Sequence, residues 1–581
     1  MNRDIYLTSF LEHTPRLLGQ MNANPASRTY GCCDRAFWHN AITVFPNARY
    51  QEAALTLSLL FLEFDTPYRA SPILLELIER TIAFWCKIQE KDGSFNEWYL
   101  REGSYVATAF SSYSISESLL LLGKERLKIF PTAVEALRKA GLWLKDRSQT
   151  TVSNQQTGAL VALQNIYLLT GETVFLEAAR QYEGLLARSQ DEEGWFKEYA
   201  GMDLGYLSLA IDYLAKYYSK TNSSRIAMVI HKAIDFLHHF VLEDGTVSGV
   251  VTSRETEYLI PHGFELWSEK HAPARFIAGR IRENLKTKKG VSLHSLDDRY
   301  LMYVGYTYLQ AGKDGPDELP VLPRPAIPFQ YLPHAGLCVY RAEDLELIGS
   351  LKKTGSFVCR VGSKRCEDSG VVIDPSTRTP AMAGGPSLGM EPNNKKSREQ
   401  IPKGQEEGTA PACRRGRGMP VGFHAQKKFF SGFMNEEVQV LRIDEKGFEV
   451  EGNFYQINEN IMTPFKNLLL NLFQMTLGRF PWLNQTVKDF LRKKLILTQK
   501  KSAFKLKRRV DVNSSGIAMT DEIIGPEFSE IILGAKVSFI YVPSSRWFQI
   551  ENLDNQPFQR IPVAGAHRSA QNTFVFTRHF P

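Results

Sequence analysis

The sequence predicts an incomplete α/α toroid in the first half of the chain and an antiparallel β-sandwich in the second half. Three observations favour this α+β, multidomain fold class. Helix-like segments recur about every 50 residues, short alternating segments replace them near residue 326, and 581 residues exceed the size of one hydrophobic core. We therefore expect a toroid over residues 1–325 and a β-sandwich domain over residues 326–581.

The composition is that of an ordinary folded protein, with 43% hydrophobic and 23% charged residues. A net charge of +7 is too small at this size to indicate a nucleic-acid partner. The first residues, MNRDIYLTSFLEHTPRLLGQ, have no uninterrupted apolar core, and no apolar run reaches the roughly 20 residues of a membrane span, so we expect a cytoplasmic protein. The seven cysteines show no zinc-ligand spacing, and we expect no metal and no cofactor.

The toroid prediction comes from a repeat. Segments with the pattern of inner helices begin at Tyr105, Asn154, Leu204 and Glu257, at separations of 49, 50 and 53 residues. Between them lie amphipathic helices such as TAVEALRKAGLWLKDRS, with apolar residues at i, i+3 and i+4. A period of about 50 residues with two helices is typical of a helical-hairpin array, which either stays open as a superhelix or closes into a ring.

Ring closure is favoured by small and aromatic residues near the start of the inner helices, such as Gly158, Gly205 and Tyr206. Small side chains let inner helices crowd around an axis. The turns before these helices carry Trp, Tyr, Glu and Asn, so we expect a cavity at one rim of the ring. The alternative is that these aromatic side chains fill the core of the toroid.

The second half changes to short alternating segments, among them GFEVEGNFYQI and FKLKRRVDV, which predict the strands of a sandwich. Residues 358–422 hold no aromatic residue and are rich in Pro, Gly, Lys and Arg, so we expect an irregular, disordered segment there. A basic interaction insert and a reading-frame artefact are the alternatives. Residues 463–497 predict a helical insertion, which either packs on its own domain or lies on a membrane surface.

Three segments occur in the order SNQQTGALVAL, EEGWFKEYAGMDLGY and SRETEYLIPHGFE. Together with a toroid followed by a sandwich, this order resembles the heparinase II/III-like family of polysaccharide lyases over about residues 30–310. The resemblance implies β-elimination at a uronic acid. Such a site must neutralise the C5 carboxylate, remove the C5 proton and protonate the leaving oxygen.

The resemblance also implies which residues form the site. Lyases of the family carry Asn-His at the start of an inner helix, where this chain has Asn154-Gln155, and glutamine cannot transfer a proton. We expect a carboxylate clamp from Asn154 and Arg254, and proton transfer from Tyr258 or His262. The candidate catalytic residues are Tyr258, His262 and Tyr206. The candidate substrate-binding residues are Asn154, Gln155, Glu198, Asp203, Arg254, Glu257, Trp195 and His39.

Structural roles are the alternatives for the same residues. Asn154 is a favoured N-cap residue, and Glu198 and Asp203 fit a turn or the first turn of a helix. Arg254 stands close to two glutamates and fits a surface ion pair. His262 and His39 fit core positions as well as they fit a ligand site.

Two functions follow. The first is an enzyme acting on an acidic, uronate-containing polysaccharide, either a lyase or a related glycan-processing activity in surface polysaccharide metabolism. The second is a non-catalytic glycan-binding or assembly protein that has lost the lyase residues. A terpene cyclase or prenyltransferase is a weaker third reading, because no Asp-rich acid motif or zinc set is evident.

Overall fold

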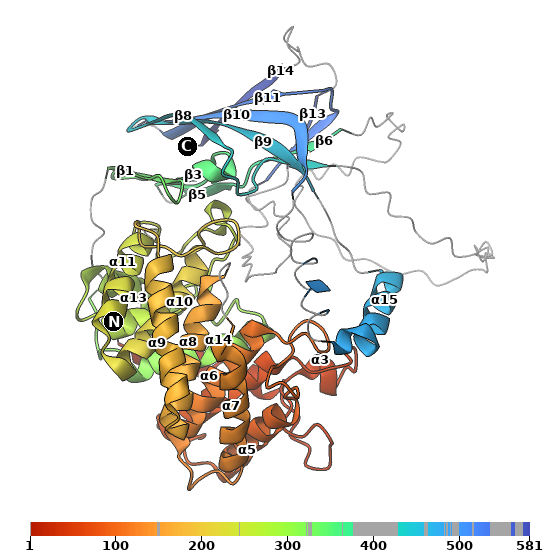
Figure 1. Ribbon diagram of the computed structural model, residues 1–581. Helices are drawn as coiled ribbons and strands as arrows, with labels where there is room; N and C mark the ends of the chain where they lie inside the picture. The colour runs from red at the N-terminus through yellow and green to blue at the C-terminus, as the bar shows by residue number, and fades with distance from the viewer. Residues whose placement is uncertain are drawn as a thin grey trace, which may run out of the picture.

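The computed structural model confirms the predicted fold class, with a helical domain below a β-domain (Figure 1). Placement is described for residues 2–147, 152–242, 244–320, 322, 328–362, 364–375, 428–457, 463–480, 483, 486–487, 490, 499–513, 516–534, 559–563 and 573–580.

Six inner helices form a ring, because each packs against the next and α14 packs against α4. The inner helices are α4 Ala53–Leu62, α6 Tyr105–Leu122, α8 Ser153–Thr170, α10 Leu204–Thr221, α12 His262–Trp267 and α14 Asp298–Asp314. The ring is uneven, because α12 has 6 residues while α6, α8 and α10 have 18 each.

The outer layer consists of helices that bury one face. They are α1 Asp4–Leu11, α5 Pro72–Lys87, α7 Phe130–Lys145, α9 Thr173–Ser189, α11 Ser224–His238 and α13 Ala272–Thr287. Short elements complete the helical domain: α2 Thr14–Leu18, α3 Arg35–Trp38, η1 Ala48–Glu52 and η2 Gly249–Val251.

The helix boundaries follow from capping residues. Ser104, Asp203 and Asp297 each accept a backbone N–H from the third residue of the helix that follows, which satisfies one of its free donors. Asn222 ends α10 in the left-handed conformation with φ 53°. The predicted starts at Tyr105 and Leu204 are therefore confirmed. The start predicted at Glu257 is wrong, because an extended segment continues to Pro261 before α12 begins.

The β-domain is a sandwich of two antiparallel sheets. The smaller sheet runs in chain order through β1 Phe329–Leu332, β2 Leu337–Arg341, β3 Leu345–Ser350, β4 Ser356–Val361 and β5 Lys364–Asp368. The larger sheet has the order β13-β12-β6-β7-β9-β10-β11-β14, with β8 beside β9. Its strands are β6 Val371–Asp374, β7 Phe429–Phe430, β8 Gln439–Asp444, β9 Gly447–Gln456, β10 Lys501–Asn513, β11 Gly516–Ile524, β12 Glu530–Leu533, β13 Gln559–Pro562 and β14 Thr573–Phe580.

The two faces of the smaller sheet pack in two different hydrophobic cores, because successive side chains of a strand point to opposite faces. Leu337 and Val339 on β2 join the core of the toroid, whereas their neighbours Cys338 and Tyr340 pack in the core between the two sheets. The smaller sheet therefore lies between the toroid and the larger sheet. This arrangement brings the loops of the sandwich against one rim of the ring (Figure 1).

The prediction of an irregular segment over residues 358–422 is wrong for the first part of this range. Residues 358–374 form the end of β4, then β5 and β6, and Val358, Val371 and Ile373 are fully buried. The β-branched residues Val371, Val372 and Ile373 favour a strand. The prediction gave more weight to the absence of aromatic residues. Residues 376–427 lie outside the described residues. Helix α15 Pro464–Met475 occupies the start of the predicted helical insertion.

Candidate functional site

The loop of residues 248–257 lies between the toroid and the sandwich and is buried throughout. Ser248 Oγ donates a hydrogen bond to Glu367 Oε1 on β5 over 3.0 Å. Lys353 Nζ, from the short turn after β3, donates to the carbonyl of Thr252 over 3.2 Å and pairs with Glu255 over 3.0 Å. Groups from the sandwich therefore fix this loop against the ring.

Asp203 fixes the same loop from the side of the toroid. Its Oδ1 caps α10 by accepting the backbone N–H of Tyr206 over 3.0 Å, and it also accepts the hydroxyl of Thr256. Its Oδ2 accepts the hydroxyl of Thr252 over 2.8 Å and the backbone N–H groups of Arg254 and Thr256 over 3.1 and 3.4 Å. Asp203 was predicted to bind substrate, but its carboxylate is occupied by these five bonds, so it is a positioning residue.

Glu198 and Asn154 form a second buried unit at the rim. The backbone N–H and the side-chain amide of Asn154 each donate to one oxygen of the Glu198 carboxylate over 2.8 Å. Burial raises the pKa of Glu198 well above its usual range, and the two bonds from Asn154 only partly oppose this. The alternative of Asn154 as an N-cap is wrong, because Val152 holds that position. Gln155 is half-buried beside it.

Arg254 lies at this rim and contacts or adjoins two residues with strained backbone conformations, Tyr199 and Glu255. Its guanidinium carbon is 4.5 Å from the centroid of the Tyr199 ring, a cation–π contact. Tyr199 and Glu255 both adopt left-handed backbone conformations, with φ of 60° and 56°, which cost energy for residues other than glycine. Such outliers cluster at functional sites. The surface ion pair considered for Arg254 is wrong, because the residue is only 5% exposed.

Two predicted tyrosines, Tyr206 and Tyr258, lie near Tyr300 from α14, and Tyr206 also lies near Arg254. The rings of Tyr258 and Tyr300 have centroids 5.8 Å apart. Burial raises the pKa of Tyr206 and of Tyr258 well above the usual range, and the neighbouring Tyr300 adds to it. The positive charge of Arg254 opposes this rise at Tyr206. Both tyrosines therefore hold their protons at neutral pH.

Sequence reasoning missed the part of the rim contributed by η1 and α14. Arg49 lies 3.9 Å from the centroid of the Tyr303 ring, and its Nε pairs with Glu52 over 2.7 Å. Burial raises the pKa of Glu52 to about 7. Tyr303 in turn lies 6.0 Å from Tyr300, which continues the cluster of tyrosines. Arg49 precedes the first of the repeat segments that were identified, so the motif could not point to it.

The two predicted histidines, His262 and His39, have their partners outside this cluster. His262 begins α12, and its Nε2 lies 2.9 Å from Asp314 Oδ2 while its Nδ1 lies 3.8 Å from Asp212 Oδ1. His39 is exposed after α3, with its Nδ1 2.8 Å from the side-chain oxygen of Asn40. Trp195 is nearly buried, and its indole N–H donates to Glu193 over 3.3 Å.

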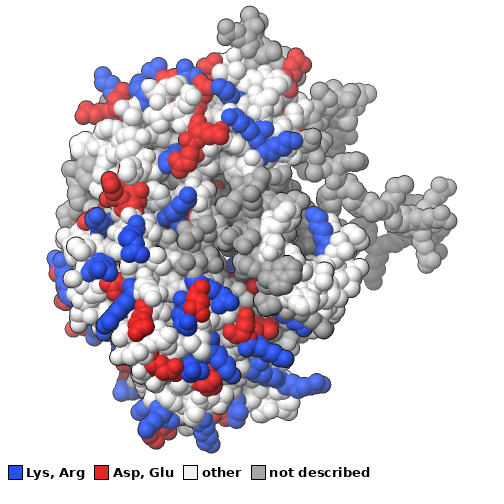
Figure 2. Space-filling view, in the orientation of Figure 1, with Lys and Arg blue, Asp and Glu red and all other residues white. Residues whose placement is uncertain are grey.

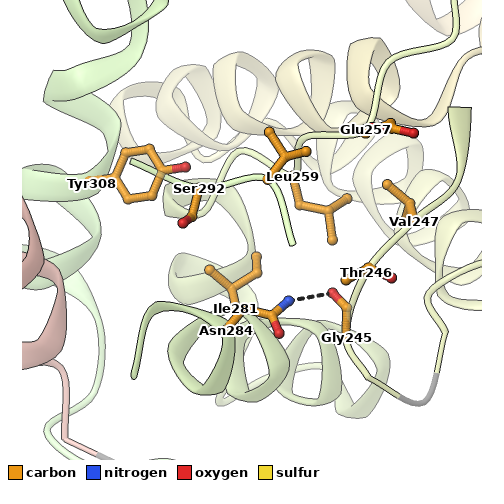
Figure 3. Close-up of a pocket in the computed structure, with 10 residues that line it drawn as sticks. Gly245, Thr246, Val247, Glu257, Leu259, Ile281, Asn284, Ser292 and Tyr308 are labelled. Atoms are coloured by element: carbon orange, nitrogen blue, oxygen red, sulfur yellow. Dashed lines mark hydrogen bonds between the residues drawn. The ribbon is translucent and has the colours of Figure 1, made fainter. Parts of the chain in front are cut away.

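Glu257 lines a small pocket that is partly open to solvent. Figure 3 shows Leu259, Ser292 and Tyr308 around this pocket. The backbone between Glu257 and Leu259 carries Tyr258 and pairs with Val291. This pocket therefore lies beside the segment that carries Tyr258, and its lining includes neither Tyr206 nor Tyr300.

One cluster among the described residues has the geometry of metal ligands. Ligand atoms of Glu12, His13 and His294 lie within 4.8 Å of one another. Lys288 Nζ already donates to Glu12 over 2.9 Å, and Arg16 Nη1 lies 3.2 Å from His13 Nδ1. Two cations at these positions oppose a dication, so the cluster does not fit a metal site.

Comparison with known proteins identifies the fold. No protein-family model matches the chain, and no curated protein has a matching sequence. The structure of Paenibacillus xanthan lyase is similar with a TM-score of 0.51 and 9% identity, over 92% of this chain and 47% of that longer chain. The Streptomyces coelicolor A3 chondroitin AC lyase, in complex with chondroitin sulphate, has a TM-score of 0.48 and 11% identity, over 92% of this chain and 71% of that chain. Heparinase III has a TM-score of 0.41 and 12% identity, over 90% of this chain and 81% of that chain.

The chain thus has the fold of an α/α toroid followed by a β-sandwich, and this fold is similar to that of the xanthan lyase. Identities near 10% establish the fold alone.

Proposed function

We propose that this protein acts on an acidic, uronate-containing polysaccharide at the toroid rim, by β-elimination or a related glycan-processing reaction. One observation carries the proposal: Arg254, in the loop between the two domains with its backbone N–H held by Asp203, lies beside the phenol of Tyr206, which in turn neighbours Tyr258. A fixed cation next to proton-transfer groups is what β-elimination at a uronate requires.

In the proposed mechanism Arg254 binds the uronate carboxylate, which stabilises the negative charge that develops when the C5 proton leaves. Tyr206 is the candidate proton acceptor, because the charge of Arg254 favours its phenolate and opposes the effect of burial; since its pKa is raised, Tyr206 must first lose its own proton before it accepts the C5 proton. Tyr258 holds its proton and is the candidate donor to the leaving oxygen. His262 is left out of this mechanism, because its ring nitrogens face Asp314 and Asp212.

Asn154 and Glu198 have a supporting role in this proposal. One amide hydrogen of Asn154 is used by Glu198, so one remains for a sugar oxygen. We therefore assign Glu198 to orienting Asn154 and to accepting a hydroxyl of the bound sugar.

The test uses a panel of acidic polysaccharides and the ultraviolet absorbance of the C4–C5 double bond that β-elimination creates. We expect Tyr206→Phe and Tyr258→Phe to lower kcat by roughly 10²–10⁴-fold, as for loss of a general acid or base. Arg254→Lys keeps the charge but loses the fixed geometry, and we expect a smaller loss. Tyr308→Phe, a buried phenol of α14 outside the cluster, is the matched control and leaves kcat unchanged. An active wild type whose kcat is unchanged in Tyr206→Phe and Tyr258→Phe would refute the site.

A non-catalytic glycan-binding or assembly protein is the second candidate. It is favoured by Gln155 where lyases of the resembled family have histidine, and by the raised pKa of both tyrosines. Binding of an acidic polysaccharide with no double bond formed would support this candidate. Absence of both binding and turnover across the panel would contradict both candidates.

A further inference from the structure

Helix α15 leaves the β-domain and reaches the toroid (Figure 1). Arg101 Nη1 donates a hydrogen bond over 2.9 Å to the carbonyl of Gln474 near the end of the helix. Gln474 is 3% exposed, so the helix rests on the protein through a polar side.

The apolar side of α15 faces outward. Its large apolar residues recur at the i, i+3, i+4, i+7 and i+10 positions of one helix face. In a helix that packs on its own domain this face is buried. Here the exposed fractions are 67% for Phe465, 55% for Leu468, 50% for Leu469, 49% for Leu472 and 61% for Met475. We call these five residues the α15 face. Leu477 and Phe480 extend it and are also more than half exposed.

The charge of the surrounding sequence is complementary to an anionic surface. Residues 460–500, which end before β10, hold seven Lys and Arg and one Asp, a net charge of +6, whereas the whole chain carries +7. The rest of the chain therefore sums to +1. Figure 2 shows the surface over α15 largely white. Positive charge is thus concentrated in the stretch of chain that contains the exposed apolar helix.

We propose that the α15 face binds the surface of a membrane that contains anionic lipids. An exposed apolar helix face with Phe and Leu, among cationic residues, inserts into the headgroup boundary, and anionic lipids add electrostatic attraction. A helix of 12 residues is about 18 Å long, too short to cross the bilayer, so it lies in the plane of the surface. No helix among the described residues is long and apolar enough to span a membrane.

The test measures co-sedimentation of the full chain with vesicles of phosphatidylcholine alone and of phosphatidylcholine with phosphatidylglycerol. We expect binding to the mixed vesicles that weakens with salt. The double variant Leu468→Asp/Leu472→Asp should lower partitioning by about 10-fold or more, because both leucines are exposed and their loss removes contact with lipid only. The matched control is Ile73→Asp/Met228→Asp, two residues of outer helices with exposed fractions of 74% and 62%, which leaves partitioning unchanged.

Two outcomes would overturn the proposal. Equal vesicle binding by the wild type and the Leu468→Asp/Leu472→Asp variant would show adhesion through charge alone. A wild type that dimerises in sedimentation without binding vesicles, and becomes monomeric in the same variant, would assign the α15 face to a second copy of the chain. The readout is partitioning, so it does not depend on any activity at the toroid rim.

Discussion

Asp203→Asn is the substitution for which the structure gives the sharpest expectation. The Asp203 carboxylate accepts two hydrogen bonds at Oδ1 and three at Oδ2, from α10 and from residues 252–256. Asparagine replaces one of these oxygens with an NH₂ group, which donates and cannot accept. At least two bonds are therefore lost whichever way the amide is turned.

The magnitude follows from the number and kind of bonds. A hydrogen bond to a buried charged group contributes about 1.5–3 kcal/mol, so losing two lowers the free energy of unfolding by roughly 3–6 kcal/mol. Asp297→Asn is the matched control. Asp297 also caps an inner helix by accepting a backbone N–H, from Tyr300 over 2.7 Å, but in contrast to Asp203 it is exposed. Asparagine caps as well as aspartate, so we expect a change of a few tenths of a kcal/mol.

The assay is urea denaturation of both variants, followed by binding of an acidic polysaccharide. We expect Asp203→Asn to weaken polysaccharide binding along with stability, because Arg254 loses the bond that holds its backbone. Substitutions at the surface usually change the free energy of unfolding by about 0.5 kcal/mol or less. If the values for Asp203→Asn and Asp297→Asn differ by no more than this amount, the positioning role of Asp203 is refuted.

Three further predictions concern buried groups. Arg508→Met should lower the free energy of unfolding by about 3–5 kcal/mol, measured by urea denaturation, because it leaves the buried carboxylate of Asp368 with one cation fewer. Burial lowers the pKa of His13 to about 4, so the folded state resists protonation and stability should rise with pH between about 4 and 6.5. After solvent screening we expect His13 to contribute about 1–2 kcal/mol to this change, and His13→Gln should reduce the slope in a pH series of thermal denaturation, leaving the part due to His294, whose pKa burial also lowers. Gly205→Ala should destabilise by about 1–3 kcal/mol, because an added Cβ would overlap Thr256, whereas a normal melting temperature would contradict that contact.

The period of about 50 residues was sufficient to predict the helical ring, because repeated amphipathic segments have few ways to bury their faces. It also placed Asn154, Glu198, Tyr206 and Arg254 at one rim, since each precedes or begins an inner helix. The period could not predict what each side chain touches. Asp203, for example, accepts hydrogen bonds from the loop of residues 248–257 and is not available to a substrate.

The misplaced and missed residues have a common cause. His262 stands where the repeat led us to expect a rim residue, but the preceding extended segment moves the start of α12 along the chain, so that His262 meets Asp314. Arg49 and Tyr303 reach the cluster from the first and last inner segments, which become neighbours only when the ring closes. A motif confined to residues 153–265 carries no information about that closure.

The loop of residues 248–257 joins the toroid to the sandwich. It receives hydrogen bonds or ion pairs from both domains, through Asp203 on one side and through Lys353 and Glu367 on the other. Arg254 is carried by the segment between these attachments. The sandwich therefore contributes to the site by fixing the loop and need not supply a reacting group, so the position of Arg254 depends on both domains being folded.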